Sequence, residues 1–255
     1  MSKYILSNYN RIDLKFINGK GSWLFTKDDK YLDFSSGIAV NCLGHANKKL
    51  IKALELQASK LWHTSNLFRI SEQEELAKKL CSYSFADKVF FCNSGAEATE
   101  AIVKIIRKYH YMMGNPNKKN IIVLDNAFHG RTMTSIQAGS NKSHREGFLA
   151  KNDCDCGFSR VKENNIMHLK KKINKNTAAI LFEPIQGEGG INTFSAAYFK
   201  KIKNLCKEKK ILLAFDEVQS GIARTGKLFS HEWYGLTPDI MSLAKGLGGG
   251  FPIGA

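Results

Sequence analysis

The sequence is poor in the residues that disorder a chain or cross-link it. Only four of its 255 residues are proline and 43% are hydrophobic, which excludes a disordered or low-complexity chain. Its six cysteines form no CxxC pair, and no histidines stand at zinc spacing. This pattern favours reduced thiols over a disulfide framework or a metal site. Cys154 and Cys156 give the one hint of a reactive thiol, and a surface loop explains them equally well.

Long hydrophobic runs are absent as well. No run of about 18 apolar residues occurs that could cross a membrane. The first residues, MSKYILSNYN, lack the apolar block and cleavage site of a signal peptide. We therefore expect a soluble cytoplasmic protein with no membrane partner.

Acidic residues are scarce relative to basic ones, with 23 against 38 and a formal net charge of +15. The basic residues are 31 lysines and seven arginines, scattered in small groups without interleaved aromatic residues. Such scatter is typical of a compositional bias rather than a nucleic-acid-binding stripe, so we expect no nucleic-acid partner. The charge favours attraction of acidic metabolites. Neither GxxxxGK[ST] nor GxGxxG is present, so nothing supports a nucleotide site.

Regular alternation of strand and helix organises most of the chain. Residues 13–35 form short alternating segments broken by turn residues, and two helices are expected over residues 48–61 and from Ser71 to about Tyr83, the second with a capping pattern from Ser71 to Glu74. Beyond residue 88, apolar strands separated by helical patterns predict an α/β fold with a mostly parallel central sheet and flanking helices. The expected strands are 89–92, 121–124, 178–182, 211–215 and 240–243, and the expected helices are 96–111 and 195–209.

The stretch ILLAFDEVQSG, from Ile211 to Gly221, is the centre of the predicted site. An apolar strand delivers Asp216 at its carboxyl end, where ligands bind in open α/β sheets. A second apolar stretch carries Lys245 into a glycine-rich turn. A partly desolvated lysine forms imines readily, and a buried carboxylate needs a cationic or hydrogen-bonding partner. A structural acid and a solvated lysine are the plainer alternatives.

The other polar clusters also follow expected strands, so five segments far apart in sequence are predicted to line one crevice. Ser94, Gly95 and Ala96 begin a helix, where backbone N–H groups and the helix dipole suit a phosphate, although a simple cap explains them too. The five clusters are Ser94–Gly95, Phe128–Arg131, Glu183–Glu188, Asp216–Gln219 and Lys245.

These motifs resemble a known family. The ordered set NSGAEATEA, AFHGRT, EPIQGEGG, FDEVQSG, RTGKLF and LAKGLGGGFPIGA is similar to the class III pyridoxal-phosphate-dependent aminotransferases of fold type I, from about Lys15 to Ala255. The resemblance implies an N-terminal segment of the small domain at residues 1–47, an incomplete cofactor-binding large domain at residues 48–255, and a missing C-terminal small domain. Thr99, Ala223 and the Ala46–Asn47 pair depart from the family pattern without removing a group of the site.

The family resemblance assigns a role to each site residue. Lys245 would hold pyridoxal 5'-phosphate as an imine and move the proton, and Asp216 would pair with the pyridinium nitrogen. Ser94, Gly95 and Ala96 would hold the phosphate. Phe128 and Val218 would pack on the two faces of the ring, and Gln219 would bond its hydroxyl. Arg131 would receive the substrate α-carboxylate, and Glu188 would help one site accept both donor and acceptor.

The activity implied is transfer of an amino group to 2-oxoglutarate. GIAVNCLGH, HTSNLF and LAKGLGGGFPIGA most resemble the acetylornithine branch, which serves arginine biosynthesis as a homodimer. The ornithine, succinyl-ornithine and diaminopimelate branches are alternatives, since none of the residues named above is expected to recognise the acetyl group. An alternative of a different class is that the chain is a non-catalytic fragment, which binds at most the cofactor or a partner subunit.

Overall fold

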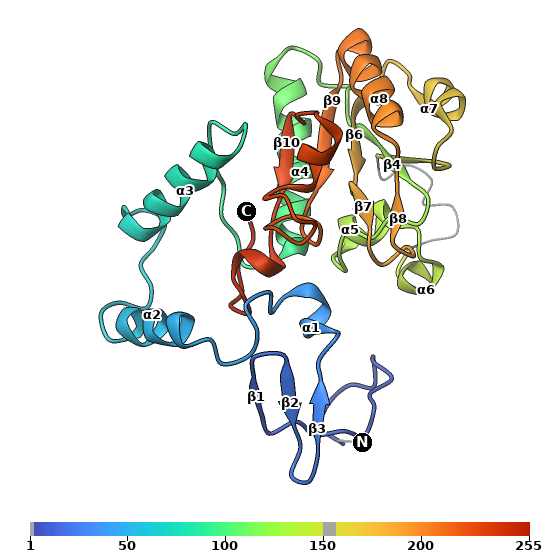
Figure 1. The fold of residues 1–255 in the computed structure, drawn as a ribbon. Helices are drawn as coiled ribbons and strands as arrows, with labels where there is room; N and C mark the ends of the chain where they lie inside the picture. The colour runs from blue at the N-terminus through green and yellow to red at the C-terminus, as the bar shows by residue number, and fades with distance from the viewer. Residues whose placement is uncertain (1–2, 150–156) are drawn as a thin grey trace.

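A five-stranded parallel sheet forms the centre of the molecule (Figure 1). The structure is a computed structural model and describes residues 3–149 and 157–255, so the Cys154 and Cys156 pair lies outside the described residues. The strand order is β10-β9-β6-β4-β5, and every neighbouring pair is parallel. The strands are β4 (Asn120–Leu124), β5 (Phe158–Val161), β6 (Thr177–Phe182), β9 (Leu212–Asp216) and β10 (Ile240–Ser242).

Helices cover both faces of this sheet, which is why its strands are apolar on both sides. On one face, α4 (Gly95–Met112) packs through Ile102 and Ile106 against alternate residues of the strands, such as Val123 of β4. On the other face, α7 (Ile166–Lys172) and α8 (Ala196–Lys209) pack against the intervening residues. Burying a side chain of this size contributes about 1.5–3 kcal/mol, so the central strands fix the core.

The direction of the chain through the sheet defines where a ligand can bind. From β4 the chain passes to β5 on one side, and from β5 it crosses to β6 on the other side of β4. In open α/β sheets, ligands bind outside the carboxyl ends of the strands near such a reversal. All five strands are parallel, so their carboxyl ends lie along one edge.

The N-terminal part forms a separate three-stranded antiparallel sheet in the order β1-β2-β3. It is followed by the single turn α1 (Ser36–Ala39) and by α2 (Lys48–Ala58) and α3 (Ser71–Tyr83), which stand away from the parallel sheet in Figure 1. None of the residues in these three helices, all of which the structure describes, is buried. The strands are β1 (Asn18–Lys20), β2 (Trp23–Phe25) and β3 (Lys30–Leu32).

Short elements connect the main ones and shape the edge where the strands end. The hairpin of β7 and β8 follows β6, and α5 follows β4 after a loop. The short elements are α5 (Met133–Ala138), α6 (Lys142–Arg145), β7 (Ile185–Gln186), β8 (Asn192–Thr193) and two 3-10 turns, η1 (Ser230–Tyr234) and η2 (Lys245–Leu247).

Most expected elements are confirmed, and two expectations are wrong. Residues 89–92 form no strand; Cys92 makes only an isolated antiparallel bridge with Gly254. Ser71 does not cap α3, because the residue at the cap is Ile70 and Glu74 instead forms a bidentate ion pair with Arg69. An exposed guanidinium five residues away competes for the carboxylate that a capping box needs.

Candidate active site

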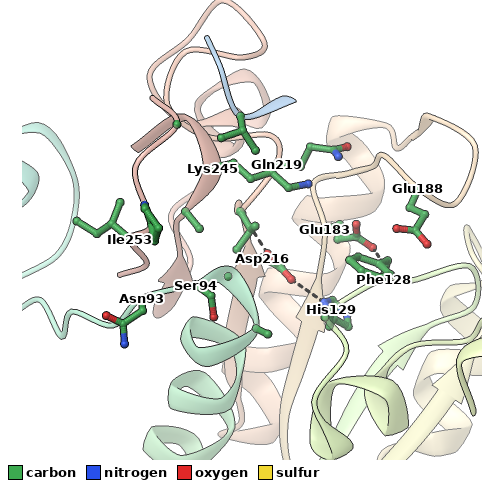
Figure 2. Close-up of a pocket in the computed structure, with 18 of the residues that line it drawn as sticks. Asn93, Ser94, Phe128, His129, Glu183, Glu188, Asp216, Gln219, Lys245 and Ile253 are labelled. Atoms are coloured by element: carbon green, nitrogen blue, oxygen red, sulfur yellow. Dashed lines mark hydrogen bonds and ion pairs between the residues drawn. The ribbon is translucent and has the colours of Figure 1, made fainter. Parts of the chain in front are cut away.

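A cleft of about 290 Å³ lies at the edge where the parallel strands end (Figure 2). The α4 amino terminus, the loops after β4, β6 and β9, and the segment after β10 all contribute side chains to it. The residues that line it are Val40, Asn93, Ser94, Gly95, Ala96, Phe128, His129, Gly130, Glu183, Ile185, Glu188, Asp216, Val218, Gln219, Ala244, Lys245, Gly250, Phe251, Pro252 and Ile253.

Asp216, the last residue of β9, is the most completely hydrogen-bonded group of the cleft. Its Oδ2 atom lies 2.8 Å from His129 Nδ1, and its Oδ1 atom accepts from the Val218 N–H and from Ser242 Oγ, each at 3.1 Å. Only 5% of the residue is exposed. The hydrogen bonds on both oxygens hold this buried carboxylate in one orientation.

His129 is fully buried beside this carboxylate. Burial lowers the pKa of its imidazole, but the hydrogen bond to Asp216 and the negative charges of Asp216 and Glu183 outweigh that cost, so its pKa is raised. The other ring nitrogen, Nε2, is buried with no hydrogen-bond partner among the described residues. The raised pKa favours the protonated form of this imidazole beside Asp216.

Glu183, which directly follows β6, is the second buried acid. Its Oε2 atom accepts from the Phe128 N–H at 2.9 Å, and burial raises its pKa to about 8. The positive charges of His129 and Lys245 oppose that rise without cancelling it. With a pKa of about 8, Glu183 favours its protonated form at neutral pH.

Lys245 lies three residues beyond the end of β10 and extends into the same cleft as Asp216 (Figure 2). Burial lowers the pKa of its ammonium group, although Asp216, Glu183 and Glu188 pull the other way. Its backbone has a φ of 45°, in the left-handed region that side chains other than glycine avoid. Strain of this kind concentrates at functional residues because the surrounding fold holds it in place.

The amino terminus of α4 points at the cleft. Ser94 Oγ accepts from the Glu97 N–H, and the Glu97 carboxylate in turn accepts from Ser94 Oγ and from the Asn93 N–H. The Ser94 side chain therefore caps α4. The first helical N–H groups, those of Gly95 and Ala96, have no intrahelical acceptor by geometry and suit an anion.

Close packing fixes the loop after β9 around this helix end. A Cβ atom at Gly95 would come within 2.6 Å of Val218 Cγ1, and a Cβ at Gly187 would overlap the Gln219 carboxamide. Only glycine permits these approaches, so Val218 and Gln219 are held at the cleft wall.

Arg131 is the one predicted site residue that does not line the cleft. It is exposed, and its Nη1 atom donates to the Tyr9 hydroxyl at 2.8 Å. Its guanidinium also lies over the Phe128 ring, 5.8 Å from the centroid. Arg131 therefore stands beside the cleft. The structure brings the other predicted residues together, namely Lys245, Asp216, Ser94, Gly95, Ala96, Phe128, Val218, Gln219 and Glu188.

Sequence reasoning missed three contributors. His129 lies inside the predicted AFHGRT cluster, five residues beyond the end of β4, but the sequence alone gives it no role. Glu183 belongs to another predicted cluster and likewise receives no role from the sequence. Ser242 gave no signal, because a serine within an apolar strand is unremarkable until its partner is known.

Two further features limit the kinds of site present. Within residues 3–149 and 157–255, no three His, Cys, Asp or Glu side chains are grouped so that they could hold a metal ion. No helix in the same ranges combines the length and the apolar character needed to cross a bilayer.

The fold and the cleft match one family. The model of the class-III aminotransferases matches residues 4–255, so the chain belongs to that family. Among similar proteins, acetylornithine aminotransferase 1 of Bradyrhizobium diazoefficiens is 53% identical over 253 residues. The acetylornithine aminotransferase of Clostridium acetobutylicum is 47% identical over 257 residues.

Solved structures of aminotransferases are also similar to this chain. An N-acetylornithine aminotransferase from Stenotrophomonas maltophilia superposes with a TM-score of 0.82 at 37% identity and covers 97% of this chain. The ornithine aminotransferase of Toxoplasma gondii superposes with a TM-score of 0.92 at 31% identity and covers 99%. The chain spans 62% of the Bradyrhizobium protein, 66% of the Clostridium protein, and 62% and 60% of the two solved chains.

Proposed function

We propose that the whole protein is an acetylornithine aminotransferase, which transfers the δ-amino group of N2-acetyl-L-ornithine to 2-oxoglutarate. The observation that carries the proposal is the placement of Lys245 and Asp216 in one cleft at the carboxyl ends of the strands. The names and the 47–53% identity of the relatives support the choice of donor. Ornithine, succinyl-ornithine and diaminopimelate are the alternative donors.

The cleft fits pyridoxal 5'-phosphate. The N–H groups of Gly95 and Ala96 offer a cradle for a phosphate, and a Cβ at Gly95 would push this cradle against Val218. The Asp216 side chain offers a partner for a pyridinium, and the strained, partly buried Lys245 offers an amine. When bound, the cofactor supplies an electron sink for the carbon that loses its proton.

The residues of the chain then have distinct tasks. Lys245 Nζ would hold the cofactor covalently and move a proton to and from the substrate carbon, because its lowered pKa increases the share of neutral amine. Asp216 would keep the ring nitrogen protonated, since His129, Val218 and Ser242 hold the carboxylate in place. Phe128 and Val218 would confine the ring, and Gln219 would bond its hydroxyl.

Arg131 and Glu188 are proposed to handle the substrate. A carboxylate bound to the Arg131 guanidinium would lie at the mouth of the cleft, because that guanidinium already rests over Phe128. A bidentate pair of this kind would orient the distal amine toward the cofactor. Glu188, on the cleft wall, would take part in accepting both substrates at one site.

Further proposals concern the whole protein. We propose a homodimer that acts in arginine biosynthesis in the cytoplasm, with residues 1–47 belonging to a small domain and residues 48–255 to the cofactor-binding large domain. Exposed apolar side chains of the N-terminal part are consistent with burial against further chain or a second subunit. They include Trp23, Phe34, Leu54, Trp62 and Phe68.

The test is a comparison of kcat/KM for the four donors, with 2-oxoglutarate as acceptor and the whole protein as enzyme. The proposal predicts the highest value for N-acetylornithine. A clear preference for free ornithine would overturn the choice of donor. Binding of cofactor without transfer from any donor would instead favour the non-catalytic alternative.

A further inference from the structure

The loop after β4 is fixed to α4 at two points that lie one helical turn apart. Ala96 and Glu100 are four residues apart and therefore share a face of α4. The backbone of Gly130, with a φ of 126°, lies so close to Ala96 that a Cβ on Gly130 would come within 2.9 Å of the alanine Cβ. One turn further along, Glu100 Oε1 accepts a hydrogen bond from Thr132 Oγ1 at 2.6 Å.

The second of these points holds the end of the loop. Thr132 is the residue before α5, and its Oγ1 atom also lies 2.9 Å from Ser135 Oγ in that helix. The O···O distance of 2.6 Å is at the short end of the range for hydrogen bonds donated by a hydroxyl. Thr132 thus joins α4, the loop and α5.

The loop carries two residues whose positions matter for the proposed reaction. Phe128 forms part of the cleft wall, and Arg131 directly precedes Thr132. The helix end that would bind phosphate is the turn of Ala96. The Glu100–Thr132 bond consequently sets the distance between the proposed phosphate site and the proposed carboxylate site.

We propose that Glu100 is a positioning residue that acts through Thr132 to place Arg131 for the α-carboxylate of the amino donor. Glu100 does not line the cleft, so it acts at one remove from substrate and cofactor. The inference rests on the proposed function for its substrate. It names a residue for which the family resemblance supplied no role.

The test uses matched substitutions in the whole protein. Glu100→Ala and Thr132→Val each remove the bond, whereas Glu100→Gln and Thr132→Ser each keep an acceptor or a donor. Lys104→Ala, at an exposed residue one turn further along α4, is the control. Four quantities are measured: KM and kcat for N-acetylornithine, the affinity for pyridoxal 5'-phosphate by absorbance titration, and hydrogen exchange of the backbone amides of residues 128–135.

We expect Glu100→Ala and Thr132→Val to raise the KM for the donor roughly ten-fold or more, because misplacement by about 1 Å can cost up to ~10²-fold. Hydrogen exchange in residues 128–135 should accelerate, while cofactor affinity and kcat stay close to those of the unaltered protein. The double substitution should be no worse than either single one, since both remove the same bond. Glu100→Gln, Thr132→Ser and Lys104→Ala should preserve KM and exchange.

Two results would overturn the inference. One is a Glu100→Ala variant with unaltered KM and unaltered exchange, or with lowered thermal stability as its only change. The other is a Glu100→Gln variant as impaired as Glu100→Ala, because the charge and not the bond would then matter. Failure of the proposed function looks different: the unaltered protein would transfer no amino group, and the exchange comparison alone would decide whether Glu100 holds the loop.

Discussion

His129 Nδ1 lies 2.8 Å from Asp216 Oδ2, and neither side chain is more than 5% exposed. This bond joins the loop after β4 to the end of β9 across the intervening strand β6. The acid proposed to hold the cofactor ring is therefore oriented by a residue from another cluster of the sequence. The ionisable side chains of the cleft lie close enough to influence one another. We therefore expect the stability of the protein to change with pH as buried groups of the cleft gain or lose a proton.

Glu183 gives the clearest pH dependence. Burial raises its pKa from 4.5 to about 8, so between these values the folded protein keeps a proton that the unfolded chain releases. Stability must fall as pH rises across that window, by an amount on the order of a few kcal/mol. His129, whose pKa is also raised, contributes stability that is complete below its unfolded pKa and is lost as pH rises through its folded pKa.

Denaturant unfolding of the whole protein at several pH values between about 5 and 8 measures this effect. Glu183→Gln, which mimics the protonated acid, should flatten the decline. Glu75→Gln, on the exposed surface of α3, is the control and should leave the decline unchanged. A Glu183→Gln variant with the full original slope would show that Glu183 is not the group responsible.

Asp216→Asn removes the charge and keeps the shape of the side chain. We expect kcat for donor turnover to fall roughly 10²- to 10³-fold, as when a preorganised electrostatic group is removed from other active sites. Asp28→Asn, in the exposed turn before β3, is the control. Retention of more than about a third of the activity by Asp216→Asn would contradict the assigned role.

Gly95→Ala places a Cβ atom within 2.6 Å of Val218 Cγ1, at the proposed phosphate cradle. The helix end or the β9 loop must then shift, which costs about 1–3 kcal/mol in a well-packed region. We expect weaker binding of pyridoxal 5'-phosphate in an absorbance titration. Gly139→Ala, whose new Cβ would meet no atom closer than 3.4 Å, should bind the cofactor normally. Equal affinities for the two variants would argue against the cradle.

Arg131→Lys tests the proposed carboxylate site. Lysine cannot form the bidentate pair, and a hydrogen bond to a charged group is worth about 1.5–3 kcal/mol, so KM for the donor should rise roughly ten- to hundred-fold. Cofactor affinity should not change, because Arg131 does not line the cleft. A loss of cofactor binding together with an unchanged KM would remove Arg131 from the donor site.

Much of this arrangement could be predicted because the informative residues follow buried strands. The apolar run before Asp216 and the alternation of β4, β6 and β9 with helices are local patterns, and parallel pairing brings their carboxyl ends together without further information. Lys245 likewise follows a strand, β10, whereas Ser94 follows residues 89–92, which form no strand, and reaches the cleft because it begins α4.

What could not be predicted depends on partners far apart in sequence. The strand β5, FSRV, contains two polar residues in four and gave no clear pattern, and the hydrogen bond from Ser242 to Asp216 joins two separate strands. The raised pKa of Glu183 arises from burial, which the local sequence EPIQ does not reveal. The bond between Arg131 and Tyr9 spans 122 positions.

The most direct test of the central claim is to find which lysine holds the cofactor. The whole protein is incubated with pyridoxal 5'-phosphate, reduced with borohydride, digested and analysed by mass spectrometry, with Lys245→Ala as the control. The sequence contains 31 lysines, so the masses of the labelled peptides distinguish a label on Lys245 from labels on surface lysines. The account predicts a single stoichiometric label on Lys245, absent from the variant. Labels spread over surface lysines, with the same yield in both proteins, would contradict it.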